Sequence, residues 1–426
     1  MSFNTALSGL RAASQDLSVK GNNIANASTT GFKGSRAEFG DVYANSLIGN
    51  GTSVGSGVLV TEIAQQFDQG NISFTDNSLD LAINGSGMFI TSDAGATTYT
   101  RAGYFGLDKD GYIVANNNAR LQGYPANSAG VISSGVLDDL QIQTQNIVPR
   151  ATTNVDIEFN LDSREGAPII TAFDMTDPDS YNTSTSLTVY DSLGNPHVQT
   201  NYFVKLEEDP LAVPPVPANA WNMHVRIDDQ IVTDDGAGNE VVGSLVFNSN
   251  GLFDLTSSNI PPINAWDPLD STGVANGAVS PSNFLIDLGD STQFGSEFSV
   301  TAIGQDGYSP GRLTSVEVDE TGVIFARYTN GEALVLGQLA LATFGNEQGL
   351  APLGDTAWGE SFESGQPVIG APQTGSLGGV QSGALEDSNV DLSEELVGLI
   401  IAQRNFQANA KTIETFDTVT QAIINI

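Results

Sequence analysis

The chain has 426 residues, a length that suggests about three domains, and 15 Lys and Arg against 50 Asp and Glu give it a formal net charge of −35. So acidic a chain lacks the basic surface that binds nucleic acid, and an anionic membrane would repel it. The sequence has no cysteine and two histidines, which excludes disulfides, thiolate zinc sites and thiol nucleophiles and disfavours most enzyme classes. Hydrophobic residues make up 40% of the chain, enough to build folded cores.

The sequence contains no segment typical of a membrane span or of a secretory signal. The longest apolar run surrounds residues 399–401 and is far shorter than the ~18–20 residues that a spanning helix needs. The first twenty residues have no continuous apolar core and contain Arg11, so they do not form a cleavable signal. Taken alone, these observations predict no membrane insertion and a cytoplasmic protein.

The N-terminal residues predict an amphipathic helix. Four apolar residues recur every seven positions and define a heptad stripe about 25 residues long, or ~38 Å as a helix. Leu7 begins a companion row, and an Asn-rich segment at residues 22–26 supplies the stop signal. The stripe consists of Phe3, Leu10, Leu17 and Ile24.

The C-terminal residues 391–426 predict a longer helix of the same kind. Asp391 and Glu394 resemble a capping box, and no proline follows them. A second heptad stripe, flanked by Leu396, runs along this helix and consists of Leu392, Leu399, Phe406 and Ile413.

Opposite charges favour pairing of the two ends. Residues 1–36 hold four basic residues and one acidic residue, whereas residues 386–426 hold seven acidic and two basic residues. Two oppositely charged heptad helices suit a coiled coil between them. The alternative is that each helix docks separately on the core of its own domain.

Between the helices the hydrophobic period changes to two. Residues 185–206 alternate around a turn at 191–195 and predict a hairpin, and Asn-Gly and Asp-Gly pairs mark further turns. The chain is therefore expected to be mainly β with helical termini and two nested antiparallel β domains. The expected parts are a terminal helical coiled-coil domain (1–27 and 387–426), Gly-rich connecting segments (28–71 and 366–386), an inner β domain (72–147 and 285–365) and an inserted outer β domain (148–284).

Motifs for catalysis and metal binding are weak. Residues 51–55 match G-x-S-x-G but lie in a Gly/Ser connector rather than in a strand–turn–helix elbow. Residues 108–111 and 234–240 resemble calcium loops without the full spacing, so turn chemistry is the better interpretation. Asn22, Asn23 and Asn26 either cap the first helix or offer hydrogen bonds to a neighbouring chain, and capping ranks first.

Motifs at both ends of the chain resemble those of the bacterial flagellar axial proteins, which form the rod, the hook and the hook–filament junction. The N-terminal motifs are at residues 6–10, 22–26 and 30–33, and the C-terminal ones at 388–396 and 403–413. Segments at 80–85, 99–103 and 121–124 resemble the β domain that this family shares. Segments at 186–195, 305–311 and 339–344 resemble the hook subunits in particular, and residues 207–285 are the part least similar to the family.

The resemblance implies a structural subunit, not an enzyme, that needs no cofactor and no metal. Such subunits assemble into a curved helical tube that encloses the export channel and transmits torque from rod to filament as a universal joint. The implied partners are other copies of the chain, the distal rod protein, the hook–filament junction protein, the hook cap and the flagellar type III export apparatus. The implied location is extracellular, in the flagellar hook on the basal body, reached without a cleaved signal peptide.

The resemblance also assigns the polymer interface to the two terminal helices. Three alternatives to a hook subunit remain: another axial protein such as the distal rod, a secreted β-rich adhesin-type module, and a polysaccharide hydrolase with Asp138 and Asp139 as paired carboxylates. The expected interface residues are Phe3, Leu7, Leu10, Leu17, Asn22, Asn23, Ile24, Asn26, Leu392, Leu396, Leu399, Phe406 and Ile413.

Overall fold

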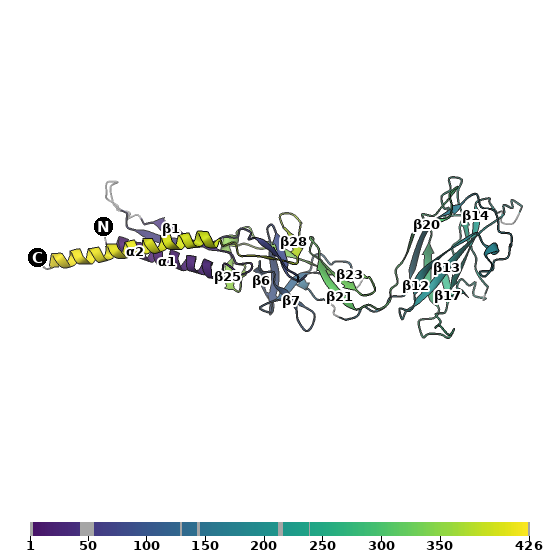
Figure 1. Cartoon of the computed structure of the whole chain (residues 1–426), viewed down its shortest axis with the longest axis horizontal. Coiled ribbons are helices and arrows are strands. Elements are labelled where there is room, and N and C mark those ends of the chain that lie inside the picture. Colours follow the sequence, from purple (N-terminus) through teal and green to yellow (C-terminus); the bar gives the residue numbers. More distant parts are fainter. Residues whose placement is uncertain are drawn as a thin grey trace. The chain divides into compact units, whose positions relative to one another are not determined.

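The computed structural model describes residues 3–42, 55–127, 130–142, 145–211, 216–237 and 239–424. The chain divides into two compact units (Figure 1). The terminal unit comprises Met1–Thr144, Thr314–Arg327 and Ala333–Ile426, and the inserted unit comprises Gln145–Leu313 and Tyr328–Glu332. The chain therefore enters the terminal unit, leaves it for the insertion and returns, as the nested order predicted.

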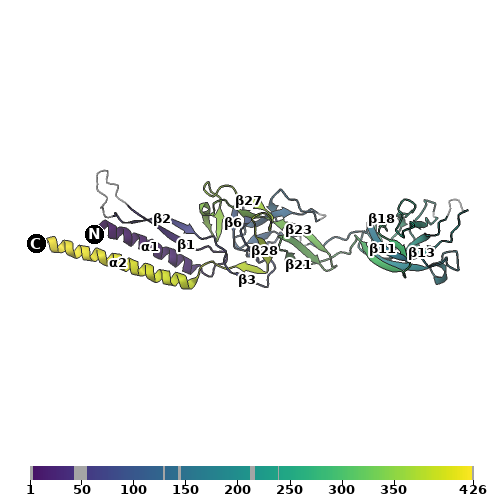
Figure 2. The ribbon, with the colours of Figure 1, turned by 90° about the horizontal axis from the view of Figure 1, so that it is seen from above.

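Both predicted terminal helices are present, α1 at Phe3–Ala25 and α2 at Leu392–Ile424. Asp391 starts α2 as expected, because its carboxylate accepts hydrogen bonds from the backbone N–H groups of Ser393 and Glu394 at 2.7 and 3.2 Å. The two helices lie side by side and antiparallel (Figure 2). The Phe3 ring lies 6.4 Å from the Phe416 ring, near the end of the helix pair that holds the start of α1 and the last turns of α2.

The β part of the terminal unit is assembled from both halves of the chain. A two-stranded ribbon, β1 and β2, packs on α1, and one extended sheet has the central order β21-β22-β23-β9-β5-β6-β26-β25. The C-terminal strands β28 and β29 pair antiparallel with β4 and β3, which lie about 300 residues earlier in the chain. The strands are β1 Ser35–Asp41, β2 Val58–Gln65, β3 Ile72–Phe74, β4 Leu81–Asn84, β5 Met88–Asp93, β6 Ala96–Thr100, β7 Phe105–Leu107, β8 Ile113–Ala115, β9 Arg120–Pro125, β10 Asp138–Asp139, β21 Leu313–Val318, β22 Val323–Tyr328, β23 Ala333–Leu339, β24 Leu341–Thr343, β25 Ala351–Gly354, β26 Ala357–Gly359, β27 Val368–Gly370, β28 Gly379–Ser382 and β29 Ala384–Glu386, and a short 3-10 helix lies at Glu347–Gly349.

The inserted unit has a core of its own. Two five-stranded sheets, one ordered β12-β13-β14-β15 with β16 on β14 and the other β17-β18-β11-β19 with β20 on β11, enclose aromatic side chains such as Phe159, Phe203, Trp221 and Trp266. The predicted hairpin is confirmed as β12 and β13, with Tyr190 opposite Pro196. The strands are β11 Asn154–Asp162, β12 Thr183–Tyr190, β13 Pro196–Lys205, β14 Ala220–Ile227, β15 Gln230–Ile231, β16 Gly243–Val246, β17 Ile263–Trp266, β18 Ser282–Asp287, β19 Thr292–Phe294 and β20 Ser299–Gln305, and a 3-10 helix lies at Pro178–Ser180.

The insertion extends further along the chain than expected. The predicted boundary at residue 284 cuts through β18, whereas the structure keeps the chain in the inserted unit as far as Leu313. The reason is strand pairing: β18 and β19 lie parallel to β11, and β20 lies antiparallel to it. The two parallel pairs are also an exception to the expected antiparallel pattern.

The expected connecting segments are more ordered than their composition suggests. Within residues 366–386, β27 pairs with β24 and β28 pairs with β4, so this stretch belongs to the sheets. Residues 49–54 of the other Gly-rich connector, which include most of the G-x-S-x-G match, lie outside the described residues. The calcium-like segment at 108–111 is a turn, because the Asp108 carboxylate accepts hydrogen bonds from the N–H groups of Asp110 and Tyr112, both at 2.8 Å.

The Glu240 carboxylate predicts how acid weakens the inserted unit. Burial favours the neutral acid, but hydrogen bonds from His224 and Arg226 outweigh it and lower the pKa of Glu240 to about 2 from 4.5. The ionised group therefore stabilises the fold fully above pH 4.5, and this contribution, on the order of 3 kcal/mol, is lost as the pH falls toward 2. We expect Glu240→Gln to melt below the wild type at pH 7, with a difference that shrinks below pH 4.5, as measured by circular dichroism.

The matched control is Glu207→Gln, which changes an exposed carboxylate of the same unit. It should melt with the wild type throughout. A wild-type to Glu240→Gln difference that stays constant from pH 7 to pH 3 would contradict the assignment.

Candidate polymer interface

The seam between α1 and α2 is made of small residues. Ala6 and Ala13 of α1 and Ala402 of α2 are buried. A Cβ added at Gly9 would lie 2.6 Å from the side-chain oxygen of Asn409, which shows how closely the helices approach. The large residues of the two heptad stripes therefore lie along the sides of the seam rather than inside it.

The predicted stripe residues are brought together but not fully covered. Leu7, Leu10, Leu17 and Ile24 are half-buried on α1, and Leu399, Phe406 and Ile413 are half-buried on α2. Phe3, Leu392 and Leu396 are 46%, 48% and 45% exposed. A single copy of the chain thus leaves much of its helical apolar surface in water, which is typical of a surface that another molecule covers.

Sequence reasoning missed a second apolar row on α2. Val397, Ile400 and Ile401 are exposed on the side of the helix that faces away from α1. Their spacing of three and four residues was the available signal, but the heptad count followed the row that starts at Leu392.

The three asparagines at the end of α1 have different roles. Asn23 is fully buried and bonds within its own chain: its amide nitrogen donates to the Ser35 carbonyl (2.8 Å) and to Glu395 (2.9 Å), and its oxygen accepts from the Ser35 N–H (2.9 Å). The expectation that Asn23 lies at the polymer interface is therefore wrong, because no part of it is accessible. Asn26 caps the helix by donating to the Asn22 carbonyl at 3.0 Å, so the first-ranked interpretation is confirmed for that residue.

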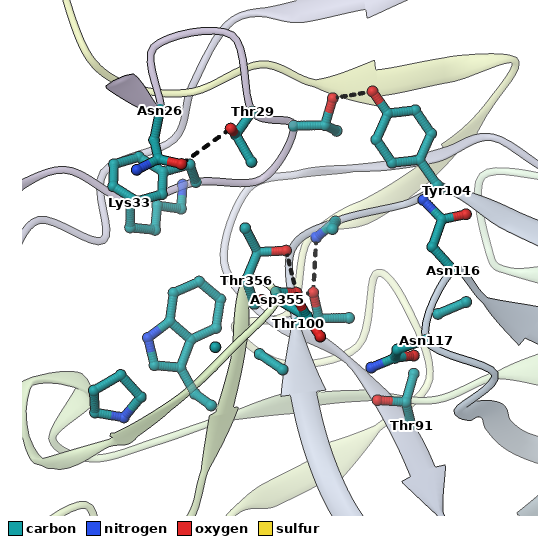
Figure 3. Close-up of a pocket in the computed structure, with 18 of the residues that line it drawn as sticks. Asn26, Thr29, Lys33, Thr91, Thr100, Tyr104, Asn116, Asn117, Asp355 and Thr356 are labelled. Atoms are coloured by element: carbon teal, nitrogen blue, oxygen red, sulfur yellow. Dashed lines mark hydrogen bonds between the residues drawn. The ribbon is translucent and has the colours of Figure 1, made fainter. Parts of the chain in front are cut away.

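Asn22 and Asn26 also line a cavity of about 690 Å³. Figure 3 shows Asn26 and Thr29 on one side of it and Asn116, Asn117 and Asp355 on the other. The wall combines amides and hydroxyls with apolar side chains such as Trp358 and Pro352, and no histidine is among the described residues that line it. Such a wall can form both hydrogen bonds and apolar contacts.

In the β part of the terminal unit, a buried ion cluster joins N-terminal and C-terminal segments of the chain. The Glu386 carboxylate, fully buried at the end of β29, accepts from Lys33 Nζ at 2.6 Å and from Arg101 Nη1 at 3.0 Å. It also accepts from the Gly70 N–H at 2.9 Å. Burial lowers the pKa of Lys33, and the Glu386 charge opposes this shift. The sequence motifs contained Lys33 and Arg101, but no local pattern indicated that they meet one carboxylate.

Two neighbouring features hold this cluster in place. Gly31 has a φ of +68°, and a Cβ there would lie 2.4 Å from the backbone nitrogen of Ala102, so only glycine fits the turn. Asn389 accepts from the Gly34 N–H at 2.8 Å and donates to the carbonyls of Gln66 (2.7 Å) and Asp68 (3.1 Å). The segment before β1, the segment after β2 and the segment before α2 are thereby tied together.

The residues that the structure describes contain no cluster of three or more His, Asp or Glu side chains that could hold a metal ion. None of the described helices is both long and apolar enough to cross a membrane.

The chain combines a pair of terminal helices, a β unit built from both halves of the chain and an inserted β unit. This combination is typical of the flagellar basal-body rod and hook proteins. Family models match in chain order: "Flagella basal body rod protein" at residues 3–33, "Flagellar hook protein FlgE/F/G D1 domain" at 82–160, "Flagellar basal body protein FlaE D2 domain" at 160–308 and "Flagellar basal body rod FlgEFG protein C-terminal" at 381–426.

Full-length relatives define the family more narrowly. The chain is 37% identical over 431 residues to the flagellar hook protein FlgE of Salmonella typhimurium, and the alignment covers 100% of both chains. It is 32% identical over 458 residues to the flagellar hook protein FlgE of Borreliella burgdorferi, covering 100% of this chain and 99% of that relative. The crystal structure of the Helicobacter pylori flagellar hook protein FlgE2 shares the fold, with a TM-score of 0.53 and 16% identity over 72% of this chain and 99% of that one. The chain belongs to the flagellar hook protein family and is a structural subunit.

The buried cluster yields a prediction about stability. Glu386→Gln leaves Lys33 and Arg101 buried without their carboxylate, and we expect a loss of about 3–5 kcal/mol from the terminal unit. Hydrogen exchange of the full chain should accelerate in peptides covering β4 and β28, whereas β11 of the inserted unit keeps its protection.

Glu38→Gln is the matched control, because it breaks the exposed pair between Arg36 and Glu38. It should cost no more than ~1 kcal/mol. Equal protection in Glu386→Gln and Glu38→Gln would show that the buried cluster does not hold the terminal unit together.

Proposed function

We propose that this chain assembles with copies of itself into the flagellar hook, a curved helical tube that encloses the export channel and transmits torque from rod to filament. The observation that carries the proposal is the half-covered helix pair, whose apolar side chains line both sides of a narrow seam. When a surface fits a different surface on an identical molecule and the rotation between copies does not close a ring, the copies form an open helical polymer. The expected interface residues other than Asn23 are the proposed contacts.

The distribution of charge suits a joint that bends. Nearly all of the net charge of −35 lies between the two terminal helices. Like charges on neighbouring copies repel weakly, which disfavours fixed packing of the β units while the helices hold the tube together. A tube with a cohesive inner layer and a mutually repelling outer layer can curve as it turns.

The histidines and carboxylates support a role without catalysis. His197 lies between two carboxylates, with Nδ1 2.5 Å from Asp228 and Nε2 3.4 Å from Asp191, inside the inserted unit. The paired-carboxylate alternative lacks support, because Asp139 is bound to Arg120 at 3.0 Å. Both arrangements account for these residues through folding alone.

The proposed partners follow from the same assignment. They are the distal rod protein, the hook cap during growth, the hook–filament junction protein and the type III export apparatus, and the proposed location is outside the cell on the basal body. The main alternative within the class is a distal rod subunit. The match of residues 160–308 to the D2 family model favours the hook.

Electron microscopy of the purified chain after salting-out tests the proposal. Tubes that show curvature support the hook, and straight tubes support a rod. Globular particles at every salt concentration would contradict self-assembly.

The middle of α2 provides a prediction about assembly. Phe406→Ala removes a half-buried ring that we expect neighbouring copies to cover in the polymer. The loss recurs at every subunit, so the critical concentration should rise at least about tenfold, which corresponds to ~1.4 kcal/mol per contact. Sedimentation of polymer against total protein measures it.

Glu414→Ala is the control, because Glu414 is exposed and forms an ion pair with Lys411 of the same helix. It should assemble at the wild-type concentration. A Phe406→Ala chain that also polymerised there would exclude this face of α2 from the interface.

The isolated subunit should have weakly protected helices. Few of the α2 side chains are buried in one chain, and helices without tertiary packing are marginally stable. We expect fast amide exchange in residues 400–424 of the monomer and slow exchange of the same residues in the polymer, with β29 protected in both. Full protection of 400–424 in the monomer would show that the helix pair needs no neighbour.

A further inference from the structure

The three tryptophans of the chain are all buried, but their indole N–H groups differ. In the terminal unit, Trp358 Nε1 donates to Gln65 Oε1 at 2.6 Å. In the inserted unit, Trp221 and Trp266 are fully buried, and neither indole nitrogen has a hydrogen-bond partner among the described residues. A buried indole N–H normally finds an acceptor, because a donor that has lost water and gained no partner is costly.

A row of buried polar side chains lies beside Trp266. His197, Gln199 and Asn201 occupy alternate positions of β13, so they point to the same face of the sheet as the core residue Phe203. The Trp266 ring lies against the His197 ring, with the ring centroids 5.1 Å apart. Gln199 and Asn201 are fully buried, although the core around them is otherwise largely apolar.

The two amides satisfy each other only in part. Gln199 Nε2 donates to Asn201 Oδ1 at 3.0 Å, but Gln199 Oε1 and Asn201 Nδ2 have no partner among the described residues. The same is true of Gln230 Nε2. Gln230 points to the same face as Gln199, because Ile227 of β14 pairs with Gln199 on one side and with Gln230 of β15 on the other. With Trp266, the row presents one acceptor and three donors that no protein atom in the described structure binds.

A cavity of about 580 Å³ connects this row with the surface. His197 and Gln230 line its inner part, and Asp270 and Ser271, which are exposed, line its mouth. Water can enter by this route, and water can both accept and donate hydrogen bonds. A buried water typically makes about three hydrogen bonds to polar groups that lack other partners, and folded proteins hold about one such water per 27 residues.

We propose that the inserted unit binds ordered water between its two sheets, at a site formed by Gln199 Oε1, Asn201 Nδ2, Gln230 Nε2 and the Trp266 indole N–H. The water accepts from the three donors and donates to Gln199. Because the amides lie on β13 and β15 and Trp266 lies on β17 of the other sheet, the water links the two sheets. An apolar ligand could not take its place, since these four polar atoms would then stay without partners.

The indole groups permit a direct test on the full-length monomer. Labelling with ¹⁵N-tryptophan gives one indole N–H signal for each of the three tryptophans. We expect the Trp266 N–H to show cross-peaks to water whose signs are opposite in NOE and ROE spectra, which distinguishes bound water from proton exchange. The Trp358 N–H is the internal control, because it is bonded to Gln65, and it should show none. A Trp266 N–H without a water cross-peak, or with one no stronger than that of Trp358, would overturn the proposal.

A substitution identifies the residues of the site. Gln199→Leu should abolish the cross-peak between Trp266 and water, because leucine offers the water no acceptor. Thr200→Val is the matched control on the same strand, since Thr200 faces away from the core and bonds with Ser186 at 3.0 Å, and it should leave the cross-peak unchanged. An unchanged cross-peak in Gln199→Leu would remove Gln199 from the site. The wild-type measurement decides whether water is bound even if this variant does not fold, and it requires no self-assembly.

Discussion

The buried Glu386 carboxylate ties together segments that lie far apart in the chain. Lys33, just before β1, and Arg101, just after β6, both bind to it, and neither the carboxylate nor the lysine has contact with water. The second positive charge is partly balanced by the carbonyls of Asp68 and Gly85, which accept from Lys33 (2.7 Å) and Arg101 (2.8 Å). Buried ion pairs of this kind add little net stability over apolar packing, but removing one partner is costly, so they enforce one arrangement.

That arrangement determines what the helices can do. With Asn23 bound to Ser35 and Glu395 just above the cluster, α1 and α2 leave the β unit together and in one register. Small residues then let the helices approach closely, and the larger apolar side chains remain along the outer sides. A tightly closed seam of leucines would have made a stable monomer with less surface for neighbours. The observed seam leaves the apolar area where another copy can cover it.

The inserted unit is organised by a different principle. Its two sheets enclose their own aromatic core, and the buried Asp191 carboxylate beside His197 is bound by side chains of the same unit. Asp191 has a lowered pKa, because hydrogen bonds from Asn195 and Asn276 outweigh the cost of burial. Stability of this unit therefore does not require the helix pair, and its acidic exterior can vary without disturbing the seam.

The amino-acid sequence alone determined the two helices, the Asp391 cap, the β-rich middle, the hairpin predicted at 185–206 and the family resemblance, because each of these depends on periodicity or on residues close together in the chain. The tertiary structure alone decided that Asn23 is internal, that the insertion ends at Leu313, and that Lys33 meets a glutamate 353 residues away. The physical reason is that a hydrophobic pattern shows which face of an element is apolar but not which partner covers it. Strand pairing with β11 and the burial of one carboxylate between distant cations arise only when segments far apart in the sequence are brought into contact.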